Sequence, residues 1–157
     1  MTSKLRRKII SILVLALAGL SPLLPPTASA QISSAKTAAK PTVMVNITCG
    51  KEDLHAACMG IGLASNAIKA GRRSDIFLNV HAVPLAAADL PADLKFADFP
   101  AVKEMLASFV AEGGELYVCG HCAAVTKVAE SNLIKGAIVT GHGDLFTKLP
   151  ATALTFS

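Results

Sequence analysis

Residues 42–71 read TVMVNITCGKEDLHAACMGIGLASNAIKAG, an apolar run followed by a helical repeat. The run at 42–47 is rich in β-favouring residues and stops at Thr48-Cys49-Gly50, which is typical of a buried strand ending in a turn. Apolar or small residues then recur at helical spacing, at Leu54, Cys58, Ile61, Ser65 and Ile68. Asp53 can cap the start of this helix, and Ala70-Gly71 closes it. The stretch therefore predicts one strand followed by one helix.

The same alternation continues to the end of the chain. Further strands are predicted at 75–83, 115–118, 136–140 and 153–156. Helical segments are predicted at 102–110, 122–131 and 143–148, and a proline-rich loop runs through Pro84, Pro91 and Pro100. Because strands alternating with helices favour a parallel sheet, we expect a single small α/β domain. Its mostly parallel sheet should have about five strands, with helices on both faces.

The amino terminus has the composition of a secretory leader. Its basic residues come first, at Lys4, Arg6, Arg7 and Lys8. An apolar run at 9–24 follows, and Ala28-Ser29-Ala30 supplies the small residues that a signal peptidase reads. The run falls short of the roughly 20 apolar residues of a membrane-spanning helix, so we expect cleavage rather than anchoring. The sequence predicts a signal peptide at 1–30, a flexible linker at 31–41 and the α/β domain at 42–157. The protein would be periplasmic or otherwise exported, with no membrane attachment after cleavage.

The charge of the chain gives no support for a nucleic-acid partner. The net charge of +4 comes from the four basic residues of the leader, since the remainder carries 11 basic and 11 acidic residues. No basic stripe interleaved with aromatic residues is present, and the chain has one Tyr and no Trp to stack on bases. We therefore expect no binding to nucleic acid.

All the cysteines follow the predicted leader, at Cys49, Cys58, Cys119 and Cys122. In an exported protein an even number permits two disulfides. A domain with abundant apolar residues does not need such staples, so reactive or metal-binding sulfur is at least as well favoured. Cys49 and Cys119 each end a predicted strand, and the carboxyl ends of parallel strands share the edge where open α/β sheets bind ligands. Cys58 lies on the apolar face of its helix and is expected to be a buried, inert thiol.

The strongest local motif is YVCGHC at 117–122, between a predicted strand and a predicted helix. A cysteine at a helix amino terminus has its thiolate favoured by the unpaired N–H groups and the helix dipole. A second cysteine three residues later can capture the first once it is oxidised or persulfidated. A thioredoxin-like dithiol is disfavoured, because no aromatic residue directly precedes Cys119 and no cis-proline strand is indicated. A structural disulfide, reactive thiol chemistry and metal binding all remain open for this motif.

The order of several stretches resembles the DsrE/DsrF-like family of sulfur-relay proteins. Residues 116–119 (LYVC), followed by Cys122-Ala123-Ala124, are similar to the cysteine-bearing strand and loop of that family. VMVNITCGKEDLHAACMGIGLASNAIKAG resembles its first strand and long helix, and DIFLNVHAVPLA its second strand. IVTGHGDLFTKL resembles its penultimate strand and the following glycine turn. The resemblance spans about residues 43–156 and includes nearly the whole predicted domain.

The resemblance implies a compact α/β domain that assembles into trimers or hexamers, with sulfur carried as a persulfide on one cysteine. Cys119 matches that carrier position, so Cys119 is the expected sulfur nucleophile, with Cys122 or Cys49 as its resolving partner. A protein that donates or accepts sulfur would be the partner. The chain departs from relay members in its predicted export and in having Thr126-Lys127 where they often have arginines. The sequence does not distinguish a carrier from an enzyme.

Two other functions are compatible with the same residues. Cu(I) or Zn(II) suits thiolate and imidazole ligands, and the candidate ligands are Cys49, Cys119, Cys122, His121 and His142. Alternatively, the chain is an oligomeric scaffold whose cysteines form structural disulfides.

Overall fold

The computed structural model describes residues 42–148 and 152–157, which fall within one unit of the chain, Thr37–Ser157. The predicted leader at 1–30 and linker at 31–41 lie outside the described residues. The strands are β1 (Val43–Ile47), β2 (Ser74–Leu78), β3 (Glu115–Cys119), β4 (Ala137–Thr140) and β5 (Thr152–Phe156). The helices are α1 (Leu54–Lys69), α2 (Val102–Ala111), α3 (Gly120–Thr126) and α4 (His142–Lys148), with short 3-10 helices η1 (Lys51–Asp53), η2 (Val80–Ala86) and η3 (Glu130–Asn132). None of the helices in this described part is long and apolar enough to cross a membrane.

The five strands form one parallel sheet in the order β4-β3-β2-β1-β5. The chain builds from β1 outward to β4 and then returns past β1 to add β5 at the opposite edge. Neighbouring strands are in register across the sheet, so that Asn46 of β1 pairs with Phe77 of β2, which pairs with Tyr117 of β3. The predicted fold class, a small α/β domain with a parallel five-stranded sheet, is confirmed.

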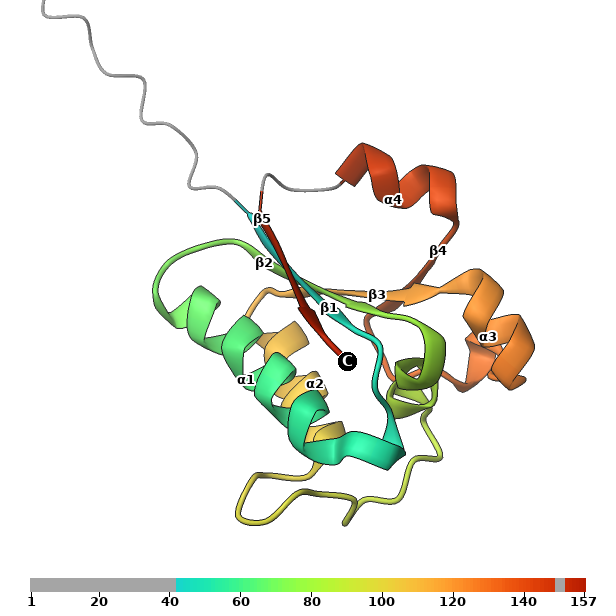
Figure 1. The fold of residues 1–157 in the computed structure, drawn as a ribbon, viewed down its shortest axis with the longest axis horizontal. Coiled ribbons are helices and arrows are strands. Elements are labelled where there is room, and N and C mark those ends of the chain that lie inside the picture. Colours follow the sequence, from blue (N-terminus) through green and yellow to red (C-terminus); the bar gives the residue numbers. More distant parts are fainter. Residues whose placement is uncertain (1–41, 149–151) are drawn as a thin grey trace, which may run out of the picture. The chain divides into compact units, whose positions relative to one another are not determined.

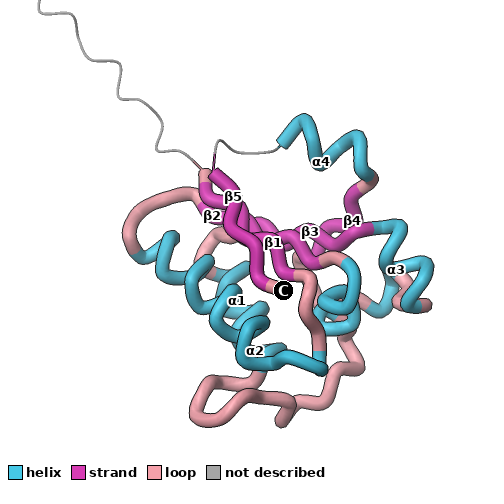
Figure 2. The backbone as a smooth tube through the Cα atoms, in the orientation of Figure 1, coloured by secondary structure: helices cyan, strands magenta, loops and turns pink. Residues whose placement is uncertain are grey.

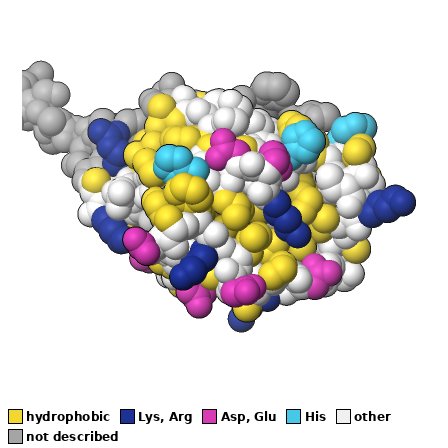
Figure 3. Space-filling view, turned by 60° about the horizontal axis from the view of Figure 1, so that its bottom comes forward, with side chains coloured by type: hydrophobic (Ala, Val, Ile, Leu, Met, Phe, Trp, Pro, Cys, Tyr) yellow, Lys and Arg dark blue, Asp and Glu magenta, His cyan; other side chains and the backbone are white. Residues whose placement is uncertain are grey.

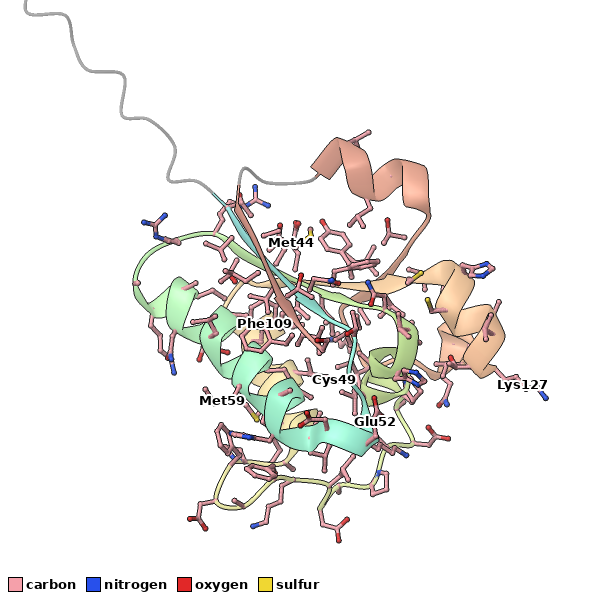
Figure 4. All side chains as sticks on the ribbon, viewed as in Figure 1. Met44, Cys49, Glu52, Met59, Phe109 and Lys127 are labelled. Atoms are coloured by element: carbon pink, nitrogen blue, oxygen red, sulfur yellow. The ribbon has the colours of Figure 1, made fainter. Side chains whose placement is uncertain are left out.

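Helices lie on both faces of the sheet, with α1 and α2 on one side and α4 on the other (Figure 1). Gly60 sets the close approach of α1, because a Cβ at this position would lie 3.0 Å from Ile47 Cδ1 and 3.3 Å from Phe156 Cδ2. Ile47 and Phe156 therefore point toward α1. Since side chains alternate along a strand, Met44 and Asn46 of β1 point to the opposite face. Figure 4 shows Met44 on the α4 side of the sheet.

The core lies between the sheet and the pair α1 and α2. Branched aliphatic residues fill the strands, as expected for parallel strands that are covered on both faces. Val45, Ile76, Leu116 and Leu106 are fully buried there. Phe109 of α2 is also fully buried and packs over Gly114, where a Cβ would collide with its ring. This core fixes the strands whose carboxyl ends carry the cysteines, and the connecting loops surround that edge (Figure 2).

Two predicted elements have the wrong bounds. The strand predicted at 75–83 ends at Leu78, because Asn79 leads into η2, a 3-10 segment that contains Pro84. The helix predicted at 122–131 begins earlier, at Gly120, and ends at Thr126. Lys127 adopts a left-handed conformation, and the N–H of Val128 bonds to the carbonyl oxygen of Ala123 at 3.0 Å, which is how many helices terminate.

Candidate functional site

Cys119 is the last residue of β3 and immediately precedes α3. Its backbone is still extended, with φ −65° and ψ 112°. The alternation of β3 places Cys119 on the same face as Tyr117, which is the face that points away from α1 and α2. Only 4% of Cys119 is exposed. The strand thus presents this sulfur at the carboxyl edge of the sheet while the surrounding chain covers most of it.

Cys122 lies beside Cys119, in the first turn of α3, and is half-buried. Burial raises the pKa of the Cys122 thiol, and the neighbouring Cys119 sulfur raises it further by accepting its hydrogen bond and by charge repulsion. A hydrogen bond with the backbone of Val80 acts in the opposite direction but does not cancel these effects. Cys122 therefore keeps its proton at neutral pH, and its thiol is directed at the Cys119 sulfur.

A shallow hollow of about 290 Å³ opens next to Cys122. It is lined by Val80, His81, His121, Cys122, Val125 and Thr126. Val80 is 48% exposed and Val125 is 68% exposed, so two apolar side chains of the lining face the solvent. On the face drawn in Figure 3, histidine side chains and hydrophobic surface lie next to each other. Cys122 thus lines a small, mainly apolar depression with an imidazole group from each of two segments.

The chain is strained on both sides of this hollow. Val80 has φ +50° and Lys127 has φ +58°, and within the described residues only Ala97 among the other non-glycine residues has positive φ. A β-branched residue such as Val80 is a rare occupant of this region, and such strain costs on the order of 1–3 kcal/mol. Because Val80 also bonds to Cys122 through its backbone, the strained conformation holds a group that contacts the site. Strained residues of this kind concentrate at functional sites.

Cys49 and Cys58 form a second, separate pair. Cys49 follows β1 on the α1 side of the sheet, and its thiol donates a weak hydrogen bond to the carbonyl oxygen of Phe156 at 4.0 Å. Burial is the main cause that raises the pKa of each thiol, and for Cys49 the charges of Asp53, Glu52 and Cys58 add to it. Figure 4 shows Cys49 close to the end of β1 and to Glu52. Both thiols are held protonated inside the core.

The structure brings Cys119 and Cys122 together but does not join Cys49 to them. β2 lies between β1 and β3, so the ends of these strands are separated by about two strand spacings, roughly 10 Å. Cys49 also points to the opposite face of the sheet from Cys119. All four cysteines are free thiols.

The metal ligands suggested by the sequence are likewise divided. His121 lines the hollow beside Cys122, whereas His142 begins α4 and its side chain lies outside what the structure describes. Among the described side chains, no three His, Cys, Asp or Glu groups lie close enough together to hold a metal ion.

Sequence reasoning missed the contribution of residues 79–81 to this edge. These residues were included in the predicted strand at 75–83, which made His81 a strand residue. The structure instead places His81 in η2, on the wall of the hollow. Asn79 and Pro84 were the available signals, because Asn is depleted in strands and Pro seldom occurs within one.

The fold has counterparts among solved structures. The crystal structure of the ychN protein from E. coli is 20% identical, with a TM-score of 0.57, and the match covers 74% of this chain and 99% of that chain. A protein of unknown function, MTH1491 from Methanobacterium thermoautotrophicum, is 14% identical, with a TM-score of 0.54 and coverage of 68% and 89%. At these identities the likeness concerns the fold alone. A comparison with curated proteins gives no significant match.

The sequence itself carries a family assignment. The sequence profile described as the DsrE/DsrF-like family matches residues 43–154, which extends from β1 into β5. This match includes both cysteine pairs and every strand of the sheet. The chain therefore belongs to the DsrE/DsrF-like family.

Proposed function

We propose that this protein handles sulfur through Cys119, which takes up a sulfur atom as a persulfide and passes it on, with Cys122 as the resolving thiol. The observation that carries the proposal is the contact between the two sulfurs, in which Cys122 keeps its proton and donates it toward Cys119. The thiolate is the attacking form of a cysteine, and Cys119 lies at the carboxyl end of β3 beside the protonated Cys122. Membership of a family of the sulfur-relay type supports the same chemistry.

The transfer step is an exchange between sulfurs. The Cys119 thiolate attacks the terminal sulfur of a donor persulfide, a new S–S bond forms on Cys119, and the S–S bond of the donor breaks. The donor leaves as a thiolate, and the proton of its persulfide stays with the transferred sulfur. An acceptor thiolate then repeats the reaction on the terminal sulfur of Cys119. No external oxidant or reductant is consumed in this sequence.

Cys122 provides a second outcome for the persulfide. If Cys122 loses its proton, its thiolate can attack the inner sulfur of Cys119, which forms a Cys119–Cys122 disulfide and expels hydrosulfide. A dithiol reductant must then restore the two thiols. The raised pKa of Cys122 keeps this route slow at neutral pH, so transfer to an acceptor is favoured.

The hollow beside Cys122 suits a docking donor or acceptor. Its exposed Val80 and Val125 side chains offer apolar contact, and His81 and His121 can hydrogen-bond to a polar group next to the incoming sulfur. The partner in this proposal is a protein or small thiol that carries a sulfane sulfur. Export by the leader at 1–30 would set this chemistry in the periplasm.

Self-association belongs to the same proposal. Ile138 of β4 and Leu154 of β5 are exposed apolar residues outside the hollow that burial against a second copy would cover. Light scattering of the purified domain should therefore give a homo-oligomer. A purely monomeric protein at tens of micromolar, a rough range for modest association, would contradict this part.

Amino-terminal sequencing of exported material should give Gln31 as the first residue.

The central test is sulfur uptake measured by mass spectrometry. Reduced, chelator-treated protein is incubated with a small-molecule persulfide, and each cysteine peptide is examined for one added sulfur. We expect the addition on Cys119, its loss in Cys119→Ser, and its persistence in Cys58→Ser as the matched control. Uptake that survives Cys119→Ser would defeat the proposal. If the parent takes up no sulfur but retains copper or zinc that Cys119→Ser loses, a metal site is supported instead.

A further inference from the structure

Two asparagine side chains form a hydrogen-bonded pair on the face of the sheet that carries Cys119. Asn46 is in β1, and Asn79 immediately follows β2. The Nδ2 group of Asn79 donates to Oδ1 of Asn46 at 2.9 Å. The Oδ1 atom of Asn79 is buried and, among the described groups, has no hydrogen-bond partner. A buried acceptor left without a donor costs about 1–3 kcal/mol, so this atom calls for a partner.

The register of the sheet sets Asn79 beside Cys119. Leu78 of β2 pairs with Val118 of β3, so the next pair along these strands is Asn79 and Cys119. Asn79 keeps an extended backbone (φ −139°, ψ 177°), and its N–H bonds to the carbonyl oxygen of Ile47 at 3.1 Å, which shows that strand-like pairing continues through it. Neighbouring parallel strands lie about 4.8 Å apart, and paired residues point to the same face. Since Asn46 holds one end of the Asn79 amide from the β1 side, the unpartnered end is left for the β3 side, where Cys119 lies.

We propose that Asn79 positions the Cys119 sulfur and stabilises its charged form, an inference that rests on the proposed function of Cys119. The pair of amides has two arrangements that keep one N–H···O bond between them. In the arrangement seen here the unpartnered atom is the Asn79 oxygen, which can accept from an S–H group. If both amides turn over, Asn46 donates to Asn79 and the Asn79 N–H is free to donate to a thiolate or persulfide anion. Asn79 therefore supplies the hydrogen-bond partner that either state of the sulfur needs.

Asn79 also completes the surroundings of Cys119. Cys122 approaches the sulfur from α3, and Thr140 of β4 pairs with Cys119 on the side opposite to Asn79. A donor from the Asn79 side would bind the outer sulfur of a persulfide on the β2 side of Cys119.

The test is the pH profile of Cys119 alkylation by iodoacetamide, followed peptide by peptide. Asn79→Asp keeps the size of the side chain but replaces the amide by an anion that accepts and cannot donate. Because a like charge nearby disfavours the thiolate, we expect its profile to move upward by about one pH unit, a tenfold slower reaction at neutral pH. Asn66→Asp is the matched control, since it makes the same change at an exposed position on α1 and should leave the profile unmoved. Asn79→Leu removes both hydrogen-bonding groups without adding charge and should give a smaller shift in the same direction, which covers the case in which Asn79→Asp fails to fold.

The outcomes separate this inference from the proposed function. Profiles of Asn79→Asp and Asn79→Leu that coincide with that of Asn66→Asp would overturn the role of Asn79, even if sulfur uptake by Cys119 is intact. A shifted profile in a protein whose Cys119 takes up no sulfur would uphold the role of Asn79 and defeat the function. A Cys119 that takes no label at any pH would overturn both.

Discussion

Cys119 and Cys122 differ from Cys49 and Cys58 in the face of the sheet that they occupy. The first pair lies at the carboxyl edge next to α3, where Cys122 opens into a hollow and the backbone is strained at Val80 and Lys127. The second pair lies on the α1 side of the sheet. Cys49 and Cys119 are almost equally buried, with 5% and 4% exposed, so the two pairs differ in their surroundings and in the half-exposed Cys122. Strand alternation, which sends Cys49 to one face and Cys119 to the other, produces this difference.

The thiols of the two pairs also differ in what controls their ionisation. Burial raises the pKa of Cys49 and of Cys58, and within the described residues no charge of opposite sign near either thiol is among the causes of the shift. Such thiols behave as small apolar residues. Cys122 has a raised pKa partly because Cys119 lies beside it, so its protonation depends on the state of another sulfur. In both pairs the charge of one cysteine raises the pKa of the other, and only in the edge pair does a hydrogen bond between the two sulfurs add to this effect.

The largest expected effect comes from placing a carboxylate in each pair. Cys58 is 0% exposed, so Cys58→Asp buries a charge without a partner and should lower the free energy of unfolding by about 3–5 kcal/mol. Cys122→Asp puts the same group in the half-exposed first turn of α3, where water can reach it although burial and Cys119 disfavour a negative charge, and should cost about 1–3 kcal/mol. Urea unfolding of both variants measures the contrast. Equal losses would remove the distinction between a core pair and an edge pair.

Alkylation rates should show the next largest contrast. Cys58 is 0% exposed and reacts only when the domain opens, so in the native protein the half-exposed Cys122 should label on the order of 100-fold faster than Cys58. Cys119 and Cys49, which are 4% and 5% exposed, should label at rates between these two. Mass spectrometry over time measures all four rates in one experiment. Labelling in denaturant is the control, because the four rates should then become similar; a Cys58 rate as fast as that of Cys119 in the native protein would be the contrary result.

The fold was largely predictable from the sequence, whereas the separation of the cysteines into two pairs on opposite faces of the sheet was not. Apolar runs such as 42–47 and the helical repeat from Leu54 onward mark elements that local propensity and burial both favour. The ends of β2 and α3 depend on the left-handed conformations of Val80 and Lys127, which neither residue type favours. The sequence indicated that Cys49 and Cys119 both end strands. It did not indicate strand order, and β2 between β1 and β3 separates the two residues.

Relief of backbone strain should have a smaller effect that again distinguishes the edge. Val80→Gly removes the cost of a β-branched residue at φ +50° and should raise the free energy of unfolding by about 0.5–1 kcal/mol, after the entropic cost of glycine is subtracted. The looser peptide should hold Cys122 less firmly, so sulfur uptake by Cys119 should slow several-fold. Ala97→Gly is the matched control, since Ala97 has φ +45° in the loop between η2 and α2. It should stabilise the domain without slowing uptake. If both variants slow uptake equally, the strain at Val80 has no special connection with the site.

The smallest expected effect is a loss of stability at alkaline pH that is carried mainly by the core pair. The folded-state pKa values of Cys49 and Cys58 are raised above the ordinary value of 9.0, which the unfolded chain retains. Below about pH 8 both states hold these protons, so the two thiols give no pH dependence. As the pH rises past 9.0 the unfolded chain loses its protons first and binds fewer than the native state, so the free energy of unfolding falls. Tyr117, whose pKa is raised by burial and by its hydrogen bond to Glu115, adds a further loss at higher pH.

Urea unfolding at pH 7 and at pH 10 should therefore show a decrease in the free energy of unfolding. This decrease should be smaller in the double variant Cys49→Ala/Cys58→Ala. Cys122→Ala should flatten it less, because a half-exposed thiol differs less between the folded and unfolded states. A fall that depends on Cys122 more than on the core pair would reverse the assignment, since it would mean that the edge thiol is the one the fold protects from ionisation.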